Sequence, residues 1–202
     1  MDLNDIKRKM AETIRSYNLK GWSPATSTNY SFRDLEKNIW VSRSGVDKSE
    51  FGENDFITVN SDGISFGEFS SVKPSAETLI HCVIYSLFPD AGVILHSHSV
   101  HPVVLSMHAG SAIEFQGYEV QKGFAGCLSH DALISIPVFN NSQDMNEFSD
   151  WMKQRKDELV NHCFVIRGHG TYAWGQNLFE AKRHLETLEY LCHCVLLNKF
   201  VK

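Results

Sequence analysis

The run Ala91-Gly92-Val93-Ile94-Leu95-His96-Ser97-His98 is the stretch of this chain that says most about its fold and chemistry. A short apolar run of this kind is typical of a buried strand. Successive side chains of a strand point to opposite faces, so His96 and His98 project in the same direction. Their imidazoles can then converge on one metal ion. The run therefore predicts part of a metal site whose third ligand comes from another segment.

Composition limits the classes of protein that this chain can represent. It has 202 residues and a formal net charge of -5, and a chain of this length favours one domain, residues 1–202. Its lysines and arginines are scattered, so we expect no nucleic-acid partner. Five cysteines, an odd number, in a chain that can bury a core without disulfides predict reduced thiols. There is no signal-peptide pattern and no apolar run of about 18 residues, so we expect a cytoplasmic protein with no membrane partner.

Apolar periodicity and turn residues predict helices that alternate with short strands. Helices are expected at 3–17, from a Ser75 cap to before Pro89, from about Pro102, at 142–156, and after an Asn177 cap. Strands are expected at 38–42, 55–59, 91–98, 133–139, 163–166 and 171–174, with residues 23–31 as a polar loop. This order predicts a compact α/β or α+β domain.

His169 is the best candidate for the third metal ligand. It lies in Arg167-Gly168-His169-Gly170, where two glycines at a strand end let the backbone bring an imidazole close to another segment. Three neutral imidazoles with one open position are typical of catalytic metal centres. His101, His108 and His130 are the alternatives for this place. Such a site accepts zinc, iron, cobalt, nickel or manganese.

Polar residues in several loops are candidates for proton transfer and phosphate binding. Glu77 begins the helix before the histidine strand, and Glu119 lies among glycines, an aromatic residue and Lys122, as in a functional loop. Hydroxyl, amide and backbone N–H groups at a helix start or in a flexible loop can bind a phosphate without a Walker motif. The chain offers Ser27, Thr28, Asn29, Ser31, Ser44, Gly45 and Ser75 for this purpose.

Five segments, taken together and in order, resemble the class II aldolase/adducin superfamily over nearly the whole chain. They are residues 21–31 (GWSPATSTNYS), 42–45 (SRSG), 73–78 (KPSAET), 96–99 (HSHS) and 167–170 (RGHG). The resemblance implies a three-layer α/β/α domain around a mainly antiparallel central sheet. It also implies one Zn²⁺ ion per subunit, bound by His96, His98 and His169, and a homotetramer with its sites between subunits.

The resemblance further implies roles for individual residues. Within the superfamily, residues 22–27, 42–48 and 119–123 are most similar to dehydratases of methionine salvage, which implies a small phosphorylated ketose as substrate. Glu119 would be the acid and base, and a pKa raised by partial burial against Tyr118 or Phe124 would suit that task. Glu77 would be catalytic or lie against the metal. The substrate would be held by Lys122 and, at its phosphate, by Asn29, Ser44, Gly45 and Ser75.

Other functions use the same features. A class II sugar-phosphate aldolase or an epimerase would have the same metal and phosphate pocket, and an adducin-like module would keep the fold without activity. A cupin oxygenase also uses a His-x-His pair, but helical patterns at both ends of the chain argue against its jelly roll. Thr28 stands where the superfamily usually has glycine. If that turn needs a positive φ, a β-branched residue there is strained by about 1–3 kcal/mol.

Overall fold

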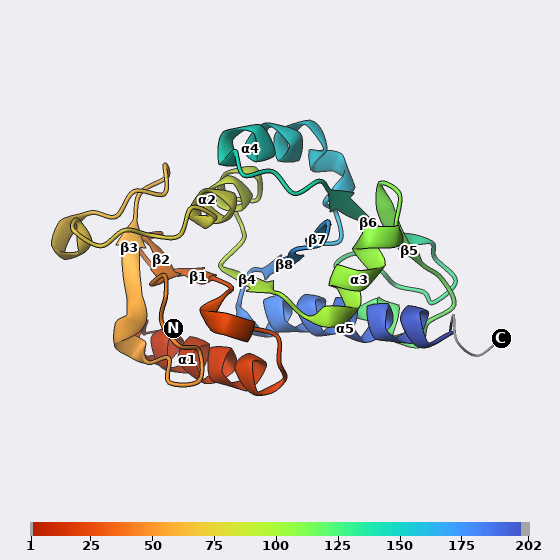
Figure 1. Cartoon of the computed structure of the whole chain (residues 1–202), viewed down its shortest axis with the longest axis horizontal. Helices are drawn as coiled ribbons and strands as arrows, with labels where there is room; N and C mark the ends of the chain where they lie inside the picture. The colour runs from red at the N-terminus through yellow and green to blue at the C-terminus, as the bar shows by residue number, and fades with distance from the viewer. Residues whose placement is uncertain (1, 199–202) are drawn as a thin grey trace.

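Eight short strands form one mixed sheet in the computed structural model, which describes residues 2–198 (Figure 1). Residue 1 and residues 199–202, the ends of the predicted domain, lie outside the described residues. The strand order is β3-β2-β1-β4-β8-β7-β6-β5, and all neighbours are antiparallel except β6 and β7. The strands are β1 (Tyr30–Arg33), β2 (Ile39–Ser42), β3 (Phe56–Val59), β4 (Val93–Ser97), β5 (Ala112–Phe115), β6 (Ile134–Phe139), β7 (Cys163–Ile166) and β8 (Gly170–Gly175).

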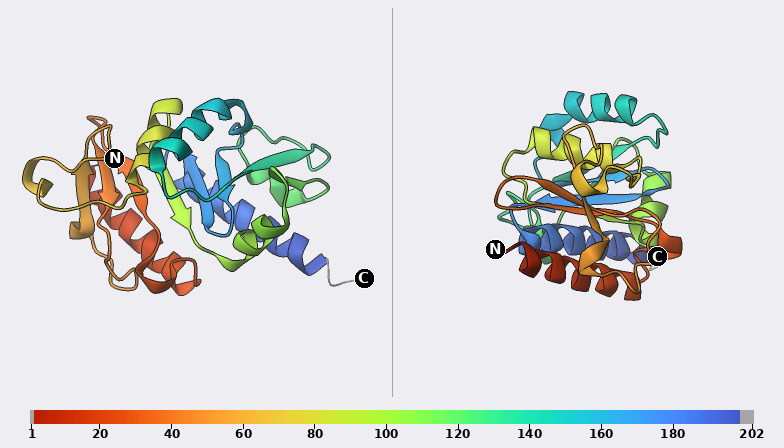
Figure 2. Two further views of the ribbon diagram at one scale, coloured as in Figure 1. Left: turned by 45° about the horizontal axis from the view of Figure 1, so that its top comes forward. Right: turned by 90° about the vertical axis from the view of Figure 1, so that its left-hand side faces the viewer.

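Helices cover both faces of the sheet, so the predicted three-layer α/β/α architecture is confirmed. The helices are α1 (Leu3–Leu19), α2 (Thr78–Leu87), α3 (Val100–His108), α4 (Met145–Gln154) and α5 (Leu178–Asn198). Seen along the sheet in Figure 2, α2 and α4 lie on one side and α1 and α5 on the other. This arrangement differs from the double-sheet jelly roll of the cupins. No helix within residues 2–198 is long and apolar enough to span a membrane.

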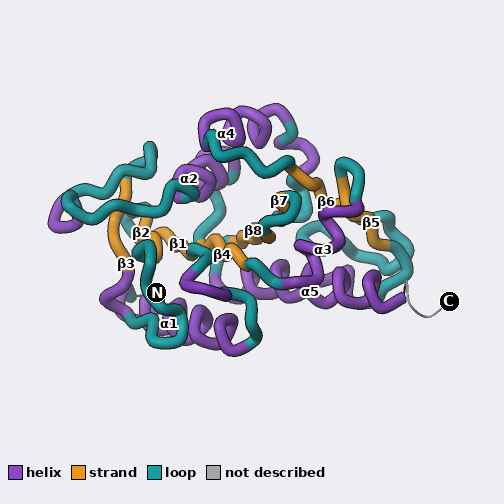
Figure 3. Tube along the Cα trace, viewed as in Figure 1, coloured by secondary structure: helices purple, strands orange, loops and turns teal. Residues whose placement is uncertain are grey.

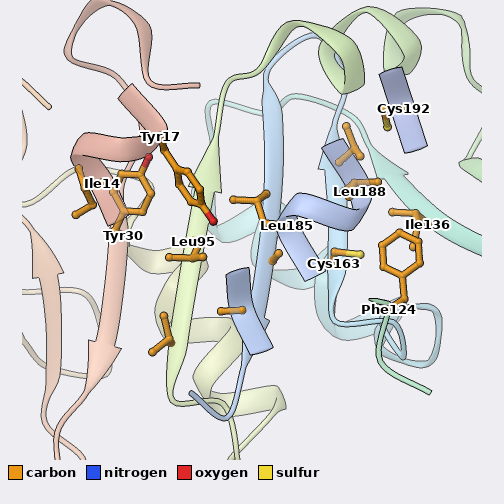
Figure 4. Packing of buried hydrophobic residues seen from close by; sticks show 14 of the residues in the cluster. Ile14, Tyr17, Tyr30, Leu95, Phe124, Ile136, Cys163, Leu185, Leu188 and Cys192 are labelled. Carbon is orange, nitrogen blue, oxygen red and sulfur yellow. The ribbon is translucent and has the colours of Figure 1, made fainter. Parts of the chain in front are cut away.

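The alternation of side chains along β4 divides the core between the two faces of the sheet. Leu95 packs with the α1 and α5 side, where Tyr17 and Leu185 are fully buried (Figure 4). Its neighbour Ile94 belongs to the cluster on the α2 and α4 side. By the same alternation His96 lies on the α2 side and Ser97 faces α5. The central strand therefore carries the candidate metal site on one face and a separate set of polar contacts on the other.

Helix starts are where the sequence predictions needed correction. Asn177 caps α5 as expected, because its Oδ1 accepts from the backbone N–H of Glu180 at 3.0 Å. Ser75 does not cap α2: the helix begins at Thr78, because residues 76–77 first form a turn whose Thr78 N–H donates to the Ser75 carbonyl. The helix predicted from residue 142 begins at Met145, because Asp144 is its N-cap: Asp144 Oδ1 accepts from the backbone N–H groups of Asn146 and Glu147.

Two strands were not predicted. β1 lies at the end of the segment read as a polar loop, and β5 follows α3. β1 pairs with both β2 and β4, so it places the preceding loop beside the end of the histidine strand.

Candidate metal centre and its cleft

Four side chains from three regions of the chain form one potential ligand cluster. Glu77, His96, His98 and His169 each offer one ligand atom, and these atoms lie within 4.8 Å of one another. β4 pairs with β8, so the turn before β8 lies beside the end of β4, and Glu77 stands just before α2. The structure thus brings together the three predicted histidines and adds a carboxylate. Among the described residues, the alternatives His101, His108 and His130 are outside this cluster.

A hydrogen bond to the backbone fixes the tautomer of the His96 ring. A carbonyl can only accept, so His96 Nδ1 donates its hydrogen to the carbonyl of Thr171 at 2.8 Å. In the neutral ring, Nε2 then carries a lone pair, and it lies 2.8 Å from His98 Nε2. Metal-binding histidines commonly use this outer hydrogen bond to orient the ring. Burial lowers the pKa of His96 well below its ordinary value and that of His98 to about 4, which keeps both rings neutral.

Glu77 is held on both of its oxygens. Oε1 lies 2.9 Å from His169 Nε2, and Oε2 accepts from Asn29 Nδ2 at 2.6 Å. Burial by itself raises the pKa of Glu77, but the hydrogen bonds from His169 and Asn29 outweigh it and hold the pKa well below its ordinary value. The cluster therefore presents imidazole nitrogens and an ionised carboxylate, a donor set that suits zinc and similar divalent metals.

A buried chain of hydrogen bonds supports Glu77 from behind. Asn29 donates to Glu77 through its side-chain nitrogen, and its Oδ1 accepts from His81 Nε2 at 2.5 Å. His81 Nδ1 must then accept from Ser31 Oγ at 2.7 Å, and Ser31 accepts from the Tyr85 hydroxyl at 2.9 Å. Every bond runs in one direction, from Tyr85 to Glu77. Sequence reasoning gave His81 no role at the metal, although it lies one helical turn after Glu77.

A cleft of about 290 Å³ opens beside the cluster. Its walls come mostly from loops, drawn teal in Figure 3, that precede β1, follow β2 and precede α2 and α4. Of the residues predicted for phosphate binding, all but Ser31 line it; Ser31 is buried and bonded to His81 instead. Three members of the cluster and a segment that sequence reasoning missed also line the cleft. The lining includes Asn29, Ser44, Gly45, Ser75, Glu77, His98, His169 and residues 141–143. A larger groove, about 820 Å³, runs along the first half of α5 beside Lys9 of α1 and Val120, and it shares no lining residue with this cleft.

Thr28 occupies the backbone conformation in which a β-branched residue is strained. Its φ is +69°, so the turn that precedes β1 does need a positive φ. Its hydroxyl lies 2.6 Å from the carbonyl of Ser27, 3.0 Å from Ser23 Oγ and 3.2 Å from Tyr30 Oη. At about 1 kcal/mol per hydrogen bond, these contacts are of the size needed to offset the backbone strain. The side chain of Thr28 therefore helps to stabilise a turn that glycine would form without strain.

Lys48, in the loop that follows β2, has a structural role that the sequence did not reveal. Its side chain is only 1% exposed, and its ammonium donates to the carbonyls of Val46 at 2.9 Å and Thr26 at 3.4 Å. Burial lowers its pKa. The ammonium thus links the loop at Thr26 to the loop beyond Gly45, and both loops contribute to the lining of the cleft.

Glu119 and Lys122 lie apart from the cluster in this chain. They belong to the short 3₁₀ segment η4 (Glu119–Gly123), and neither lines the cleft. The side chain of Glu119 is 74% exposed and pairs with Lys122 at 2.7 Å. The hydrogen bond from Lys122 lowers the pKa of Glu119. The expectation of a raised pKa is therefore wrong for this chain, because Glu119 faces solvent and a lysine and is not buried against Tyr118 or Phe124.

The fold agrees with those of known proteins to which the chain is similar. Residues 8–196 match the Class II Aldolase and Adducin N-terminal domain family, and the chain belongs to this family. The solved L-fuculose-1-phosphate aldolase from Thermus thermophilus superimposes with a TM-score of 0.73 at 22% identity, covering 98% of this chain and 95% of the aldolase.

Sequence relatives narrow the comparison to one enzyme. The chain is 49% identical over 192 residues to methylthioribulose-1-phosphate dehydratase from Picosynechococcus sp., covering 94% of this chain and 91% of the relative. It is 40% identical over 196 residues to methylthioribulose-1-phosphate dehydratase from Xanthomonas campestris, covering 96% and 89%. The resemblance predicted from the motifs is confirmed.

Proposed function

We propose that this protein dehydrates 5-methylthioribulose 1-phosphate to 2,3-diketo-5-methylthiopentyl 1-phosphate in methionine salvage, in the cytoplasm. The observation that carries the proposal is the shared cleft, which joins the histidine and glutamate cluster to the hydroxyl and amide groups expected around a phosphate. The 49% identity to a dehydratase of this name over nearly the whole chain supports the choice of reaction.

The metal in this proposal is Zn²⁺, one per subunit. His96, His98 and His169 would hold it, with the carboxylate of Glu77 beside them. When bound, zinc would supply Lewis acidity that stabilises the negative charge developing on the oxygens of the substrate. The chain prepares this site by keeping His96 neutral and oriented through Thr171 and by fixing Glu77 between His169 and Asn29.

The phosphate in this proposal lies between the cleft loops. Ser44 and Ser75 offer hydroxyls, and Gly45, at φ +77°, offers a backbone N–H in an open turn. Asn29 donates one amide hydrogen to Glu77, which leaves the second hydrogen of the same nitrogen for the phosphate. Lys48 supports these loops from within, through its bonds to the carbonyls of Val46 and Thr26.

Dehydration needs one group that takes a proton and later returns one. A base removes the proton on C3; the electrons of that C–H bond form a C2–C3 double bond while the π electrons of the C2 carbonyl move onto its oxygen, giving an ene-diolate. The C2 carbonyl then re-forms, the double bond shifts to C3–C4 and the C4–O bond breaks, so that the leaving hydroxyl takes the proton held by the base and departs as water. The resulting enol tautomerises to the 2,3-diketone. Glu77 is tied to His169 and Asn29, so Glu119 is the group we assign to both transfers.

Glu119 lies outside the cleft of its own chain, so a neighbouring subunit would supply it together with Lys122. This requires the predicted homotetramer with sites between subunits. The exposed position of η4 supports the proposal, since a second chain can reach Glu119 without any rearrangement of the sheet.

Product identification tests the reaction. Zinc-loaded protein is given methylthioribulose 1-phosphate, and the diketone is expected; dihydroxyacetone phosphate without the diketone would instead show an aldolase, which breaks the C3–C4 bond. Glu119→Gln is expected to lose turnover, whereas Glu114→Gln, at an exposed glutamate on β5, is the matched control.

Mixed oligomers test whether the site is shared. Glu119→Gln and His169→Ala are each expected to be inactive alone. Co-expressed and purified as a mixed tetramer, they are expected to regain activity, because some sites combine intact histidines from one chain with Glu119 from its neighbour. Mixed tetramers that stay inactive would show that Glu119 does not act between subunits.

A further inference from the structure

A buried acid lies behind the histidine strand, on the face opposite the cleft. Glu189 of α5 is 3% exposed and faces the sheet among apolar residues of the helix. Its carboxylate accepts from Ser97 Oγ at 2.8 Å, from Thr171 Oγ1 at 3.4 Å and from Ser99 Oγ. A buried carboxylate is costly unless several donors satisfy it, and here three hydroxyls do so.

All three donors belong to the segments that carry the candidate ligands. Ser97 lies between His96 and His98, and Ser99 directly follows His98. Thr171 pairs with Ser97 across the β4–β8 ladder, and its carbonyl accepts from the His96 ring. One carboxylate therefore joins the end of β4 to the start of β8 at the level of the cluster.

The hydrogen bonds of Glu189 lie at the point where the backbone pairing of β4 with β8 ends. β4 ends at Ser97, so His98 lies beyond the paired strand, and its backbone N–H donates to the carbonyl of Trp22. The serines on both sides of His98 are each held by Glu189, which fixes the backbone that orients this ring. On the other strand, the bond to Thr171 fixes the residue whose carbonyl sets the His96 tautomer.

We propose that Glu189 is a positioning residue for the candidate metal centre, which holds the two ligand-bearing strands in register through Ser97, Ser99 and Thr171. The inference rests on the metal centre of the proposed function and is independent of which bond the enzyme breaks. Outer groups that orient metal ligands typically contribute about 10–100-fold to metal affinity, so an effect of this size is expected here.

Zinc affinity of the full chain is the readout, measured by competition with a chromophoric chelator. Glu189→Leu is expected to bind zinc at least tenfold more weakly than the unaltered protein. Burial raises the pKa of Glu189 to about 7, so Gln is its neutral isostere, and Glu189→Gln is expected to retain most of the affinity. The matched control is Glu186→Leu on the same helix, at a side chain 42% exposed and paired with Lys20, which is expected to leave zinc affinity unchanged.

The outcomes separate this inference from the proposed function. A folded Glu189→Leu protein that binds zinc as tightly as the unaltered chain would overturn the role of Glu189 and leave the metal centre intact. An unaltered chain that binds no zinc would overturn the metal centre and this inference with it. If Glu189→Leu does not fold, Ser99→Ala and Thr171→Val each remove one contact, and unchanged zinc affinity in both would overturn the proposal.

Discussion

Gly170→Ala is expected to damage the candidate metal centre by forcing apart the two strands that carry it. Gly170 begins β8, and a Cβ atom there would lie 2.2 Å from the carbonyl oxygen of Ser97, 2.8 Å from His98 Cδ2 and 3.1 Å from His96 Cε1. A relaxed carbon–oxygen contact is about 3.3–3.6 Å, so β4 and β8 must separate by about 1 Å at this point. Over-packing of this kind costs about 1–3 kcal/mol.

Two measurements are expected to change together. Urea unfolding of the metal-free Gly170→Ala protein should show a free energy of unfolding lower by about 1–3 kcal/mol. Its zinc affinity should fall at least tenfold, because the added methyl group presses on the Ser97 carbonyl and on both histidine rings. Gly110→Ala is the control, since a Cβ there meets nothing within 4 Å and its φ is not positive.

Unchanged stability with unchanged zinc affinity would refute this reasoning. It would mean that β4 and β8 do not approach each other at Gly170 as closely as the structure describes. Lower stability with full zinc affinity would show instead that the histidines do not depend on the spacing of these strands.

Three further predictions concern the cluster, its buried support and the cleft loop. His169→Ala is expected to lower the zinc content well below one per chain, whereas His101→Ala, which lies outside the cluster, should keep it; metal analysis of gently purified protein decides. Burial lowers the pKa of His81 to about 3 in the folded protein. As pH drops below about 6.5, His81 is therefore protonated in the unfolded state and not in the folded state, and the free energy of unfolding falls. His81→Gln lacks this titration, so from pH 6.5 to 4.5 the unaltered protein should lose about 2–3 kcal/mol more than the variant in urea unfolding; parallel profiles would contradict this. Thr28→Val keeps the strained turn without its hydroxyl, so it should lose about 1–2 kcal/mol of stability and raise KM more than it lowers kcat.

Sequence patterns were sufficient where the controlling interactions are local. The long apolar stripes of α1 and α5 and the strand alternation at His96 and His98 depend on spacing alone, and the structure agrees with each. The glycines around His169 likewise indicated a backbone that could bring a third imidazole to the pair. Most of the layered architecture followed from the motif resemblance and from these elements.

Residues that act through distant contacts could not be predicted in the same way. β1 was read as loop because Ser31 is polar, yet Ser31 is buried by its bond to His81, fifty positions along the chain. His81 lies within the largely apolar helix α2, and Glu189 is one of several polar residues of α5, so the spacing of neither residue distinguishes it. The position of Glu119 depends on how η4 packs, and no pattern in residues 117–123 indicates that its side chain faces solvent.

The one-directional chain from Tyr85 to Glu77 determines when the site becomes ordered. Its links are buried and form as the sheet and α2 assemble, so the carboxylate already has its orientation before any substrate arrives. The entropy lost in ordering Glu77 therefore belongs to folding and not to each catalytic cycle. Binding free energy from the phosphate end of the substrate is then available to align its reacting carbons, with little reorganisation of the protein around them.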